Sequence, residues 1–338
     1  MGNTILLTGG AGYIGSHTFS ALVQAGFDVV ILDDFSNAQA TVIDRLAQIT
    51  GRDVTCYTGS VLDPVMLDQI FASHAIDAVV HFAARKAVGE SVAQPLDYFD
   101  TNISGLLTLL QAMKRAGVWR LVFSSSAAVY GVPDIVPTPE TAPCRHENPY
   151  GFTKITGELI LQQAAGADPF AFGILRYFNP AGAHPSGLIG EDPNGVPNNL
   201  MPFVAQVAVG QRTHINVFGN DYPTRDGTGE RDYIHVMDLA RGHVMSLQSL
   251  IDTNKGHLVN LGTGVAYSVL DMIAAYGRVV GRDLPYELAP RRAGDVPIYL
   301  ADVTRARDIL GFETEFDLMD MCQSSWQWIN RGIQGGAT

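Results

Sequence analysis

The stretch TGGAGYIG, residues 8–15, follows a short apolar run and opens an amphipathic helical pattern at the start of the chain. Glycine lets the backbone turn sharply and approach a pyrophosphate, and a helix N-terminus offers free N–H groups to an anion. Simple turns also produce such strings in a chain with 35 glycines, so the placement between a strand and a helix decides the argument. We predict a dinucleotide site on Gly9, Gly12 and Gly15.

Apolar runs and amphipathic stretches alternate through the first half of the chain. The expected strands are Thr4–Thr8, Asp28–Leu32, Asp53–Tyr57, Ala78–Phe82, Arg120–Ser124 and Phe170–Arg176. The expected helices are Tyr13–Ala25, Ala38–Gln48, Pro64–Ser73, Pro95–Ala116 and Pro149–Ala165. Strands joined through helices form a parallel sheet that is covered on both faces. The pattern therefore predicts a doubly wound α/β fold of the Rossmann type.

Proline and glycine become dense after Asn179, over residues 180–202 and 219–229, which indicates functional loops. The expected later elements are Met201–Val209, Ile215–Phe218, Val236–Leu250, His257–Leu261, Thr304–Leu310 and Leu318–Arg331. We predict a nucleotide-binding domain over residues 1–178 and a smaller mixed α/β substrate domain over residues 179–338. We expect no clean boundary, because segments near 236–261 can pack back on the first domain.

Composition excludes several classes of protein. Apolar residues make up 46% of 338 positions, which excludes a disordered chain. The formal net charge of −12 leaves no basic footprint for nucleic acid. Cys56, Cys144 and Cys322 lie far apart, so we expect neither a metal site nor a disulfide framework. Without a basic leader or an apolar run near ~18 residues, we expect a cytoplasmic protein with no membrane partner.

Asp33 closes the second expected strand, about where an acid binds the adenosine ribose hydroxyls in dinucleotide sites. Residues 34–37 include no arginine for a 2′-phosphate, so the sequence favours NAD over NADP. A solvated loop acid is the alternative interpretation of Asp33.

Tyr150 and Lys154 share one face of a helix that begins at Asn148-Pro149. Ser126 follows the fifth expected strand at its carboxyl end, where open α/β sheets place their ligands. A phenol has a pKa of ~10, and lowering it to about 7 takes ~4 kcal/mol. A nearby ammonium and a positive nicotinamide ring both favour the phenolate.

This arrangement predicts a proton and hydride transfer. Tyr150 would remove a hydroxyl proton while hydride leaves the same carbon for NAD, and Ser126 would hydrogen-bond the reacting oxygen. The alternative is an interior tyrosine beside a surface lysine.

The glycine stretch, Ser126 and the Tyr150-x-x-x-Lys154 pair resemble the extended short-chain dehydrogenase/reductase family. Longer motifs are similar to the nucleotide-sugar epimerases of that family, from about Thr4 to the last expected helix. They are HFAARKAVGES (81–91), SSSA (124–127), LRYFNP (175–180), PNNLMP (197–202), FGNDYPT (218–224) and RDYIHV (231–236).

The resemblance implies a tightly held NAD and an interconversion of UDP-glucose and UDP-galactose. Tyr150 would take the proton of the sugar 4-hydroxyl as hydride leaves C4. The 4-keto sugar would then turn about its link to the diphosphate, and hydride would return to its other face. A homodimer packed through Pro95–Ala116 and Pro149–Ala165 is also implied, although both helices could be covered within one chain.

By this resemblance, further residues belong to the two binding sites. Those for NAD are Tyr13, Ile14, Asp33, Asn37, Phe82, Ala83, Lys86 and Phe178, beside the glycines, Tyr150 and Lys154. Those for the UDP-sugar are Asn179, Asn199, Leu200, Phe218, Arg231, Arg292 and Asp295, with Ser126, Tyr150 and Tyr299 at the sugar. Guanidinium groups suit phosphate oxygens. Each of these roles has an alternative. Arg231 and Arg292 could be ordinary solvated arginines, Lys86 could be a surface residue, and Asn198 and Asn199 could be helix caps.

Some positions depart from the family pattern. Ser60 stands where many relatives carry Asp, and Thr101 stands where Asn is usual. Phe152 replaces a commonly polar residue inside the YxxxK motif. Tyr299 borders the sugar, and a bulky side chain there is expected to crowd an N-acetyl group. We therefore expect glucose and galactose rather than N-acetylhexosamine specificity.

Two other functions remain open from the sequence. A nucleotide-sugar 4,6-dehydratase would need an acidic pair after the serine, but Ser126 is followed by Ala127-Ala128. A non-catalytic NAD-binding protein would not need Ser126, Tyr150 and Lys154 together.

Overall fold

A seven-stranded sheet forms the larger part of the computed structural model, which describes residues 2–192, 197, 199–292 and 295–335. Its strand order is β10-β6-β5-β4-β1-β2-β3, and every neighbouring pair is parallel. The strands are β1 (Thr4–Thr8), β2 (Asp28–Asp33), β3 (Thr55–Thr58), β4 (Ile76–His81), β5 (Arg120–Ser126), β6 (Ala171–Tyr177) and β10 (His257–Leu261). This doubly wound order confirms the predicted fold class.

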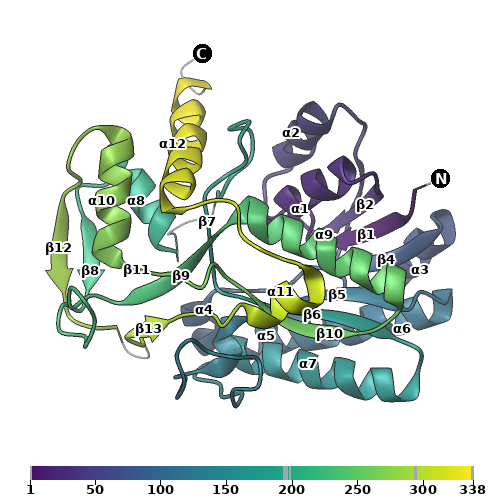
Figure 1. Ribbon diagram of the computed structural model, residues 1–338. Coiled ribbons are helices and arrows are strands. Elements are labelled where there is room, and N and C mark those ends of the chain that lie inside the picture. The colour runs from purple at the N-terminus through teal and green to yellow at the C-terminus, as the bar shows by residue number, and fades with distance from the viewer. Residues whose placement is uncertain (1, 193–196, 198, 293–294, 336–338) are drawn as a thin grey trace.

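Helices bury both faces of this sheet, as Figure 1 shows. Ile5 and Leu7 pack in one core and Leu6 in the other, because successive strand side chains point to opposite faces. The first face is covered by α1 (Tyr13–Gln24), α2 (Thr41–Thr50) and α9 (Val236–Thr253). The second is covered by α3 (Pro64–Ser73), α6 (Gly105–Ala116) and α7 (Pro149–Ala167). Burial on both faces explains the nearly continuous apolar runs.

A second lobe holds two small sheets and three helices. The sheets join β7 (Asn179–Ala181), β9 (Glu230–His235), β11 (Ala266–Ser268) and β13 (Ile298–Tyr299), and β8 (Ile215–Phe218) with β12 (Tyr286–Ala289). The helices are α8 (Leu200–Ala208), α10 (Val269–Val280) and α12 (Leu318–Gly335). Strand β9 and helix α10 were not predicted, although Ser268 and Asp271 form a capping box that marks the start of α10.

The chain returns to the large sheet after building part of the second lobe. Helix α9 packs on α1, and β10 lies beside β6 at the sheet edge. Helix α11 (Thr304–Leu310) also contacts β10 and α9. Within the described residues, no helix has both the length and the apolar character needed to cross a bilayer.

The expected single helix Pro95–Ala116 is wrong. The structure has α4 (Val88–Ala93), α5 (Pro95–Phe99), a π-helical turn at Asp100–Ser104 and then α6. The wide turn carries the buried Asn102, whose Oδ1 accepts from Arg85 N at 2.8 Å. Its Nδ2 donates to Arg85 O and to Thr153 Oγ1, both at 3.0 Å. The turn thereby ties the segment after β4 to α7, and such π-turns are frequent at functional sites.

A buried ion pair fixes α7 against the sheet. Arg176 on β6 donates to both carboxylate oxygens of Glu158 on α7, at 2.9 and 2.5 Å. Both side chains are 4% exposed. Ser125 Oγ on β5 donates to the same carboxylate at 2.5 Å. One carboxylate therefore joins α7 to two neighbouring strands.

Glu158→Ala is expected to lower the free energy of unfolding by about 3–5 kcal/mol, because it leaves the Arg176 guanidinium buried without a counter-ion. Urea unfolding monitored by circular dichroism measures this loss. The matched control is Asp68→Ala, which breaks the exposed Arg115–Asp68 pair at 2.8 Å and should cost at most about 1 kcal/mol. Equal losses in the two variants would contradict the interpretation.

Candidate active site

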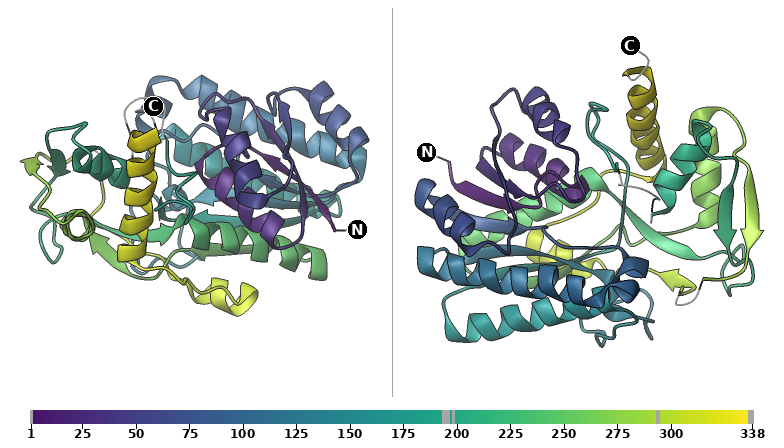
Figure 2. Two further views of the ribbon diagram at one scale, coloured as in Figure 1. Left: turned by 90° about the horizontal axis from the view of Figure 1, so that it is seen from above. Right: turned by 180° about the vertical axis from the view of Figure 1, so that it is seen from behind.

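A cleft of about 1520 Å³ lies at the carboxyl ends of β1 and β4, where the strand order reverses direction. Residues of both lobes line it, and Figure 2 shows the two lobes from two further sides. A pocket for one drug-sized ligand has about 300–1,000 Å³. This cleft therefore has room for two ligands side by side.

At two of the three predicted glycine positions, the surrounding atoms leave no space for a side chain. Gly9 has φ +70°, and a Cβ there would lie 2.7 Å from Ala83 N. A Cβ on Gly15 would lie 2.2 Å from Gly9 O. Gly12 differs, because its φ of −67° suits any residue and the nearest atom to a Cβ would be Gly9 O at 3.4 Å. The fold does not require glycine at position 12, so its missing side chain leaves space on the cleft wall for a ligand.

Asp33 is 8% exposed on the same wall, so the alternative of a solvated loop acid is wrong. Its carboxylate accepts from Ala11 N and Phe35 N, both at 2.8 Å. Burial raises the pKa of this carboxyl above its usual range. Helix α1 starts beside it with no side-chain cap and no acid in its first turn, which favours an anion there. These features fit the pyrophosphate and ribose of a dinucleotide.

The start of α7 brings the predicted chemical groups together. Asn148 caps this helix by accepting from Gly151 N at 2.9 Å. Lys154 Nζ donates to Ser124 O at 2.7 Å and lies 5.8 Å from the centroid of the Tyr150 ring. Ser126 lies close enough to the Tyr150 phenol to act toward lowering its pKa. All three predicted chemical residues line the cleft, so Lys154 is not a surface lysine.

Burial dominates the electrostatics of this pair. It raises the pKa of the Tyr150 phenol above its ordinary value, and this effect is larger than the opposite effect of the nearby Ser126 hydroxyl. Burial also lowers the pKa of Lys154 to about 8. With a pKa of about 8, Lys154 still carries a positive charge at neutral pH, so its expected role beside the phenol stays a prediction. A positively charged ligand in the cleft would favour the phenolate further.

Most of the other predicted site residues lie on the cleft wall. They are Tyr13, Ile14, Asn37, Phe82, Ala83, Lys86, Phe178, Asn179, Asn199, Arg231, Asp295 and Tyr299, together with the departures Ser60 and Thr101. Of the described residues predicted for the site, Leu200, Phe218 and Arg292 are not on this wall. The Arg292 guanidinium lies 4.7 Å from the Phe218 ring centroid and donates from Nε to Asp295 at 3.0 Å. Arg292, placed over the Phe218 ring, therefore helps to fix the position of the Asp295 carboxylate.

The second lobe contributes a cation and an aromatic wall. Arg231 on β9 pairs in register with Tyr299 on β13, and its guanidinium lies 5.9 Å from that ring. It also donates to Val296 O at 2.9 Å and lies 3.6 Å from Asp295. Its side chain is 19% exposed, so it is not a solvated arginine. The Tyr299 hydroxyl donates to the Gly131 carbonyl, which fixes the ring at the cleft.

Glu191 is a cleft residue that the sequence analysis missed. Asn199 Nδ2 donates to its Oε1 at 2.6 Å, and Lys86 Nζ lies 3.5 Å from the same oxygen. Asn199 occupies the N-cap position of α8, but its side chain makes no cap bond, so that alternative is wrong. Asn198 lies outside the described residues. No motif marks Glu191, since Asn199 lies eight residues further along the chain and Lys86 comes from the segment after β4.

The sheet order, the glycine loop and the serine–tyrosine–lysine group together define the class of extended short-chain dehydrogenases/reductases. The family described as GDP-mannose 4,6 dehydratase matches residues 6–325. The chain is 52% identical over 332 residues to the UDP-glucose 4-epimerase of Bacillus subtilis, across 98% of each chain.

Two solved structures are similar over nearly the whole chain. One is UDP-glucose-4-epimerase from Stenotrophomonas maltophila with bound NAD and formylated UDP-arabinopyranose (TM-score 0.96, 48% identity, 98% of this chain and 99% of that one). The other is UDP-glucose 4-epimerase from Bifidobacterium longum with NAD+ and UDP (TM-score 0.93, 46% identity, 98% and 100% covered). The chain belongs to the UDP-glucose 4-epimerase family.

Gly12→Val is expected to weaken dinucleotide binding about 10- to 100-fold, because forcing a side chain into filled space costs about 1–3 kcal/mol. Isothermal titration of ligand-free protein with NAD measures this. Gly9→Ala should instead lower the melting temperature with or without NAD, because its Cβ meets the Ala83 backbone. Gly89→Ala, with open space around it, is the control for both. Unchanged NAD affinity in Gly12→Val would contradict the assignment of this wall.

Proposed function

We propose that the protein interconverts UDP-glucose and UDP-galactose by transient oxidation at the sugar C4, with NAD as a tightly held cofactor. The observation that carries the proposal is the single cleft in which the glycine loop faces the Ser126–Tyr150–Lys154 group. The similarity to epimerases crystallised with NAD and uridine nucleotides supports the same assignment. We assign NAD to the lobe built by residues up to 178 and the UDP group to residues from 179 onward, with the reacting sugar hydroxyl at Ser126 and Tyr150.

In this proposal the chain's own residues move the proton. NAD, when bound, supplies the acceptor and donor of hydride and a positive charge beside Tyr150. That charge opposes the effect of burial, so Tyr150 can take the proton of the sugar 4-hydroxyl and later return it. Ser126 donates a hydrogen bond to the reacting oxygen, and Lys154 is held beside the phenol by the Ser124 carbonyl. Turning the 4-keto sugar within the cleft inverts the configuration.

The uridine diphosphate is assigned to the second lobe. Arg231 supplies a partly buried guanidinium, and Asn199 supplies an amide at the start of α8. Arg292, whose guanidinium lies over the Phe218 ring, donates to Asp295. In a chain of net charge −12, these few cations concentrate the attraction for a diphosphate in one place.

A 4,6-dehydratase is the second candidate, because the matching family carries that description. Ser126 is followed by Ala127 and Ala128, and both alanines line the cleft. Neither can supply the acid and base that elimination of water requires. This observation favours the epimerase.

The test is to give the purified protein UDP-galactose without added nucleotide and to quantify UDP-glucose by chromatography. We expect turnover, and NAD in the supernatant after denaturation. Tyr150→Phe should lose about 10²- to 10⁴-fold in rate, as expected for loss of a general base. Tyr177→Phe removes a second, partly buried phenol, bonded to Ser124 Oγ at 2.6 Å, and should keep most of the rate. Well-folded protein without interconversion would refute the proposal, and a 4-keto-6-deoxy product would indicate the dehydratase.

The same assay tests the sugar range. Tyr299 is held by its hydroxyl bond to Gly131 and by the Phe178 ring at 6.1 Å, so it cannot easily swing aside for an N-acetyl group. Tyr299→Gly should raise the efficiency with UDP-N-acetylglucosamine, relative to UDP-glucose, at least about 10-fold. Efficient use of that substrate by the unmodified protein would refute this assignment.

We also propose a homodimer packed through α6 and α7. Both helices cover the same sheet face, and they expose Leu107 (41%), Leu159 (53%) and Phe152 (38%) to solvent. Sedimentation should give about twice the 36.4 kDa chain mass. Leu107→Lys with Leu159→Lys should shift the protein toward monomer, whereas Leu288→Lys in the second lobe should not. A parent protein that sediments as a monomer would contradict the proposal.

A further inference from the structure

Glu191 lies in residues 182–192, the stretch after β7 that contacts both lobes. This segment begins near Gly182, whose carbonyl accepts from the Tyr13 hydroxyl at 2.7 Å. It then passes Gly190, where a Cβ would lie 2.5 Å from the indole of Trp328 on α12. The segment is therefore held against both α1 and α12. The Glu191 side chain is only 11% exposed.

One oxygen of Glu191 meets both halves of the cleft. Oε1 accepts from Asn199 Nδ2 at 2.6 Å and lies 3.5 Å from Lys86 Nζ. Lys86 follows β4 on the nucleotide side, and Asn199 begins α8 on the substrate side. The negative charge of Glu191 also raises the pKa of the Tyr13 phenol, after burial. The carboxylate thus faces the first turn of α1 as well.

The ion pair with Lys86 does not by itself explain why a carboxylate stands at position 191. Both expected ligands are diphosphates, and the chain already carries a net charge of −12, so another anion in the cleft repels them. The hydrogen bond offers a different explanation. A carboxylate that holds Nδ2 of a planar amide also fixes the direction of its Oδ1. Because Asn199 makes no helix-cap bond, Glu191 is the partner that orients it.

We propose that Glu191 is a positioning residue that orients Asn199 for the UDP-sugar and ties it to Lys86 of the cofactor side. This inference rests on the proposed function. Glu191 then acts on substrate affinity and not on the transfer of the proton or hydride. Its removal should raise KM while leaving kcat nearly unchanged.

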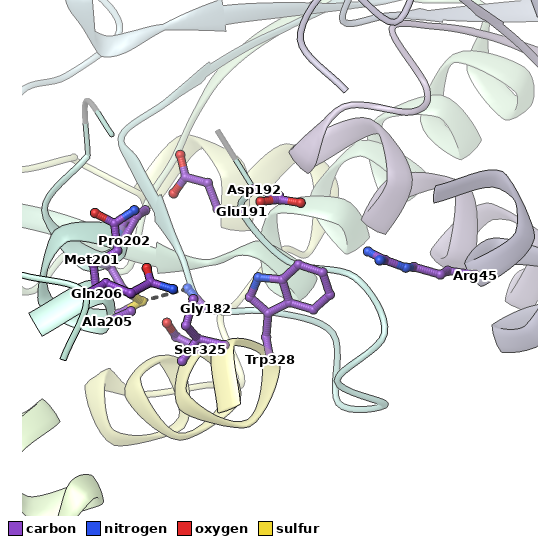
Figure 3. A pocket seen from close by; sticks show the side chains of 12 residues that line it. Arg45, Gly182, Glu191, Asp192, Met201, Pro202, Ala205, Gln206, Ser325 and Trp328 are labelled. Carbon is purple, nitrogen blue, oxygen red and sulfur yellow. Dashed lines mark hydrogen bonds between the residues drawn. The ribbon is translucent and has the colours of Figure 1, made fainter. Parts of the chain in front are cut away.

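Three variants of the NAD-containing protein separate position from charge. Glu191→Ala should raise KM for UDP-galactose about 10-fold with kcat within about twofold, as for loss of a charge-assisted hydrogen bond. Glu191→Gln removes the charge but keeps an oxygen for Asn199, so it should restore most of the affinity. The control is Asp192→Asn, which also removes one negative charge. The exposed Asp192 side chain points to a different side from Glu191 in Figure 3, so this variant should not raise KM.

A double-variant cycle adds an independent readout. In the Asn199→Ala background, Glu191→Ala should raise KM no further, because the group that it orients is gone. Full additivity of the two changes would overturn the proposal. So would an unchanged KM in Glu191→Ala, a loss confined to kcat, or equal changes in Glu191→Ala, Glu191→Gln and Asp192→Asn. Melting temperatures of all variants identify any general loss of fold.

Binding of UDP alone separates this inference from the proposed function. Calorimetric titration of UDP into the NAD-containing protein should show the same order of affinities, with the parent and Glu191→Gln above Glu191→Ala. If the parent protein does not epimerise but this order holds, the proposed function fails and the positioning role stands. If the parent protein epimerises but UDP binds equally well to the parent and to the Glu191 variants, the positioning role fails.

Discussion

The carboxylate of Glu158 is the constraint on which the geometry of the site depends. It accepts from Arg176 on β6 and from Ser125 on β5. It lies on the same helix as Tyr150 and Lys154, one turn beyond the lysine. The rotation of α7 about its axis is therefore set by a buried charge pair. That pair aims the Lys154 ammonium at the Ser124 carbonyl and places the Tyr150 phenol near Ser126. Arg176 extends the network to the Tyr130 hydroxyl, which bonds Asn260 on β10.

Burial and charge act against each other in the cleft. A dry environment raises the pKa of the Tyr150 phenol and lowers that of Lys154 to about 8, so burial disfavours the charged form of both groups, although Lys154 still carries its proton at neutral pH. A positively charged cofactor beside Tyr150 would act against the effect of burial and favour the phenolate.

Local chemistry made much of the site predictable. The glycine loop, Asp33 and the Tyr150–Lys154 pair depend on spacings within one strand, turn or helix, and the structure places all of them on one cleft wall. The contacts of Asn102 and Glu191 were not predictable, because each needs partners from separate elements. Asn102 reaches Thr153 across 51 residues through a π-turn that no apolar period indicates. The missed α10 is a different case, since its capping box was present in the sequence and was overlooked.

The return of the chain to the large sheet has a mechanical consequence. The backbone passes between the lobes after Tyr177, His235, Leu261, Tyr299 and Leu310, because α9, β10 and α11 belong with the large sheet. Two lobes joined by one linker can swing apart on a hinge, whereas lobes stitched together by several covalent crossings can only shift slightly. The repeated crossings therefore limit how far the two walls of the cleft can move apart.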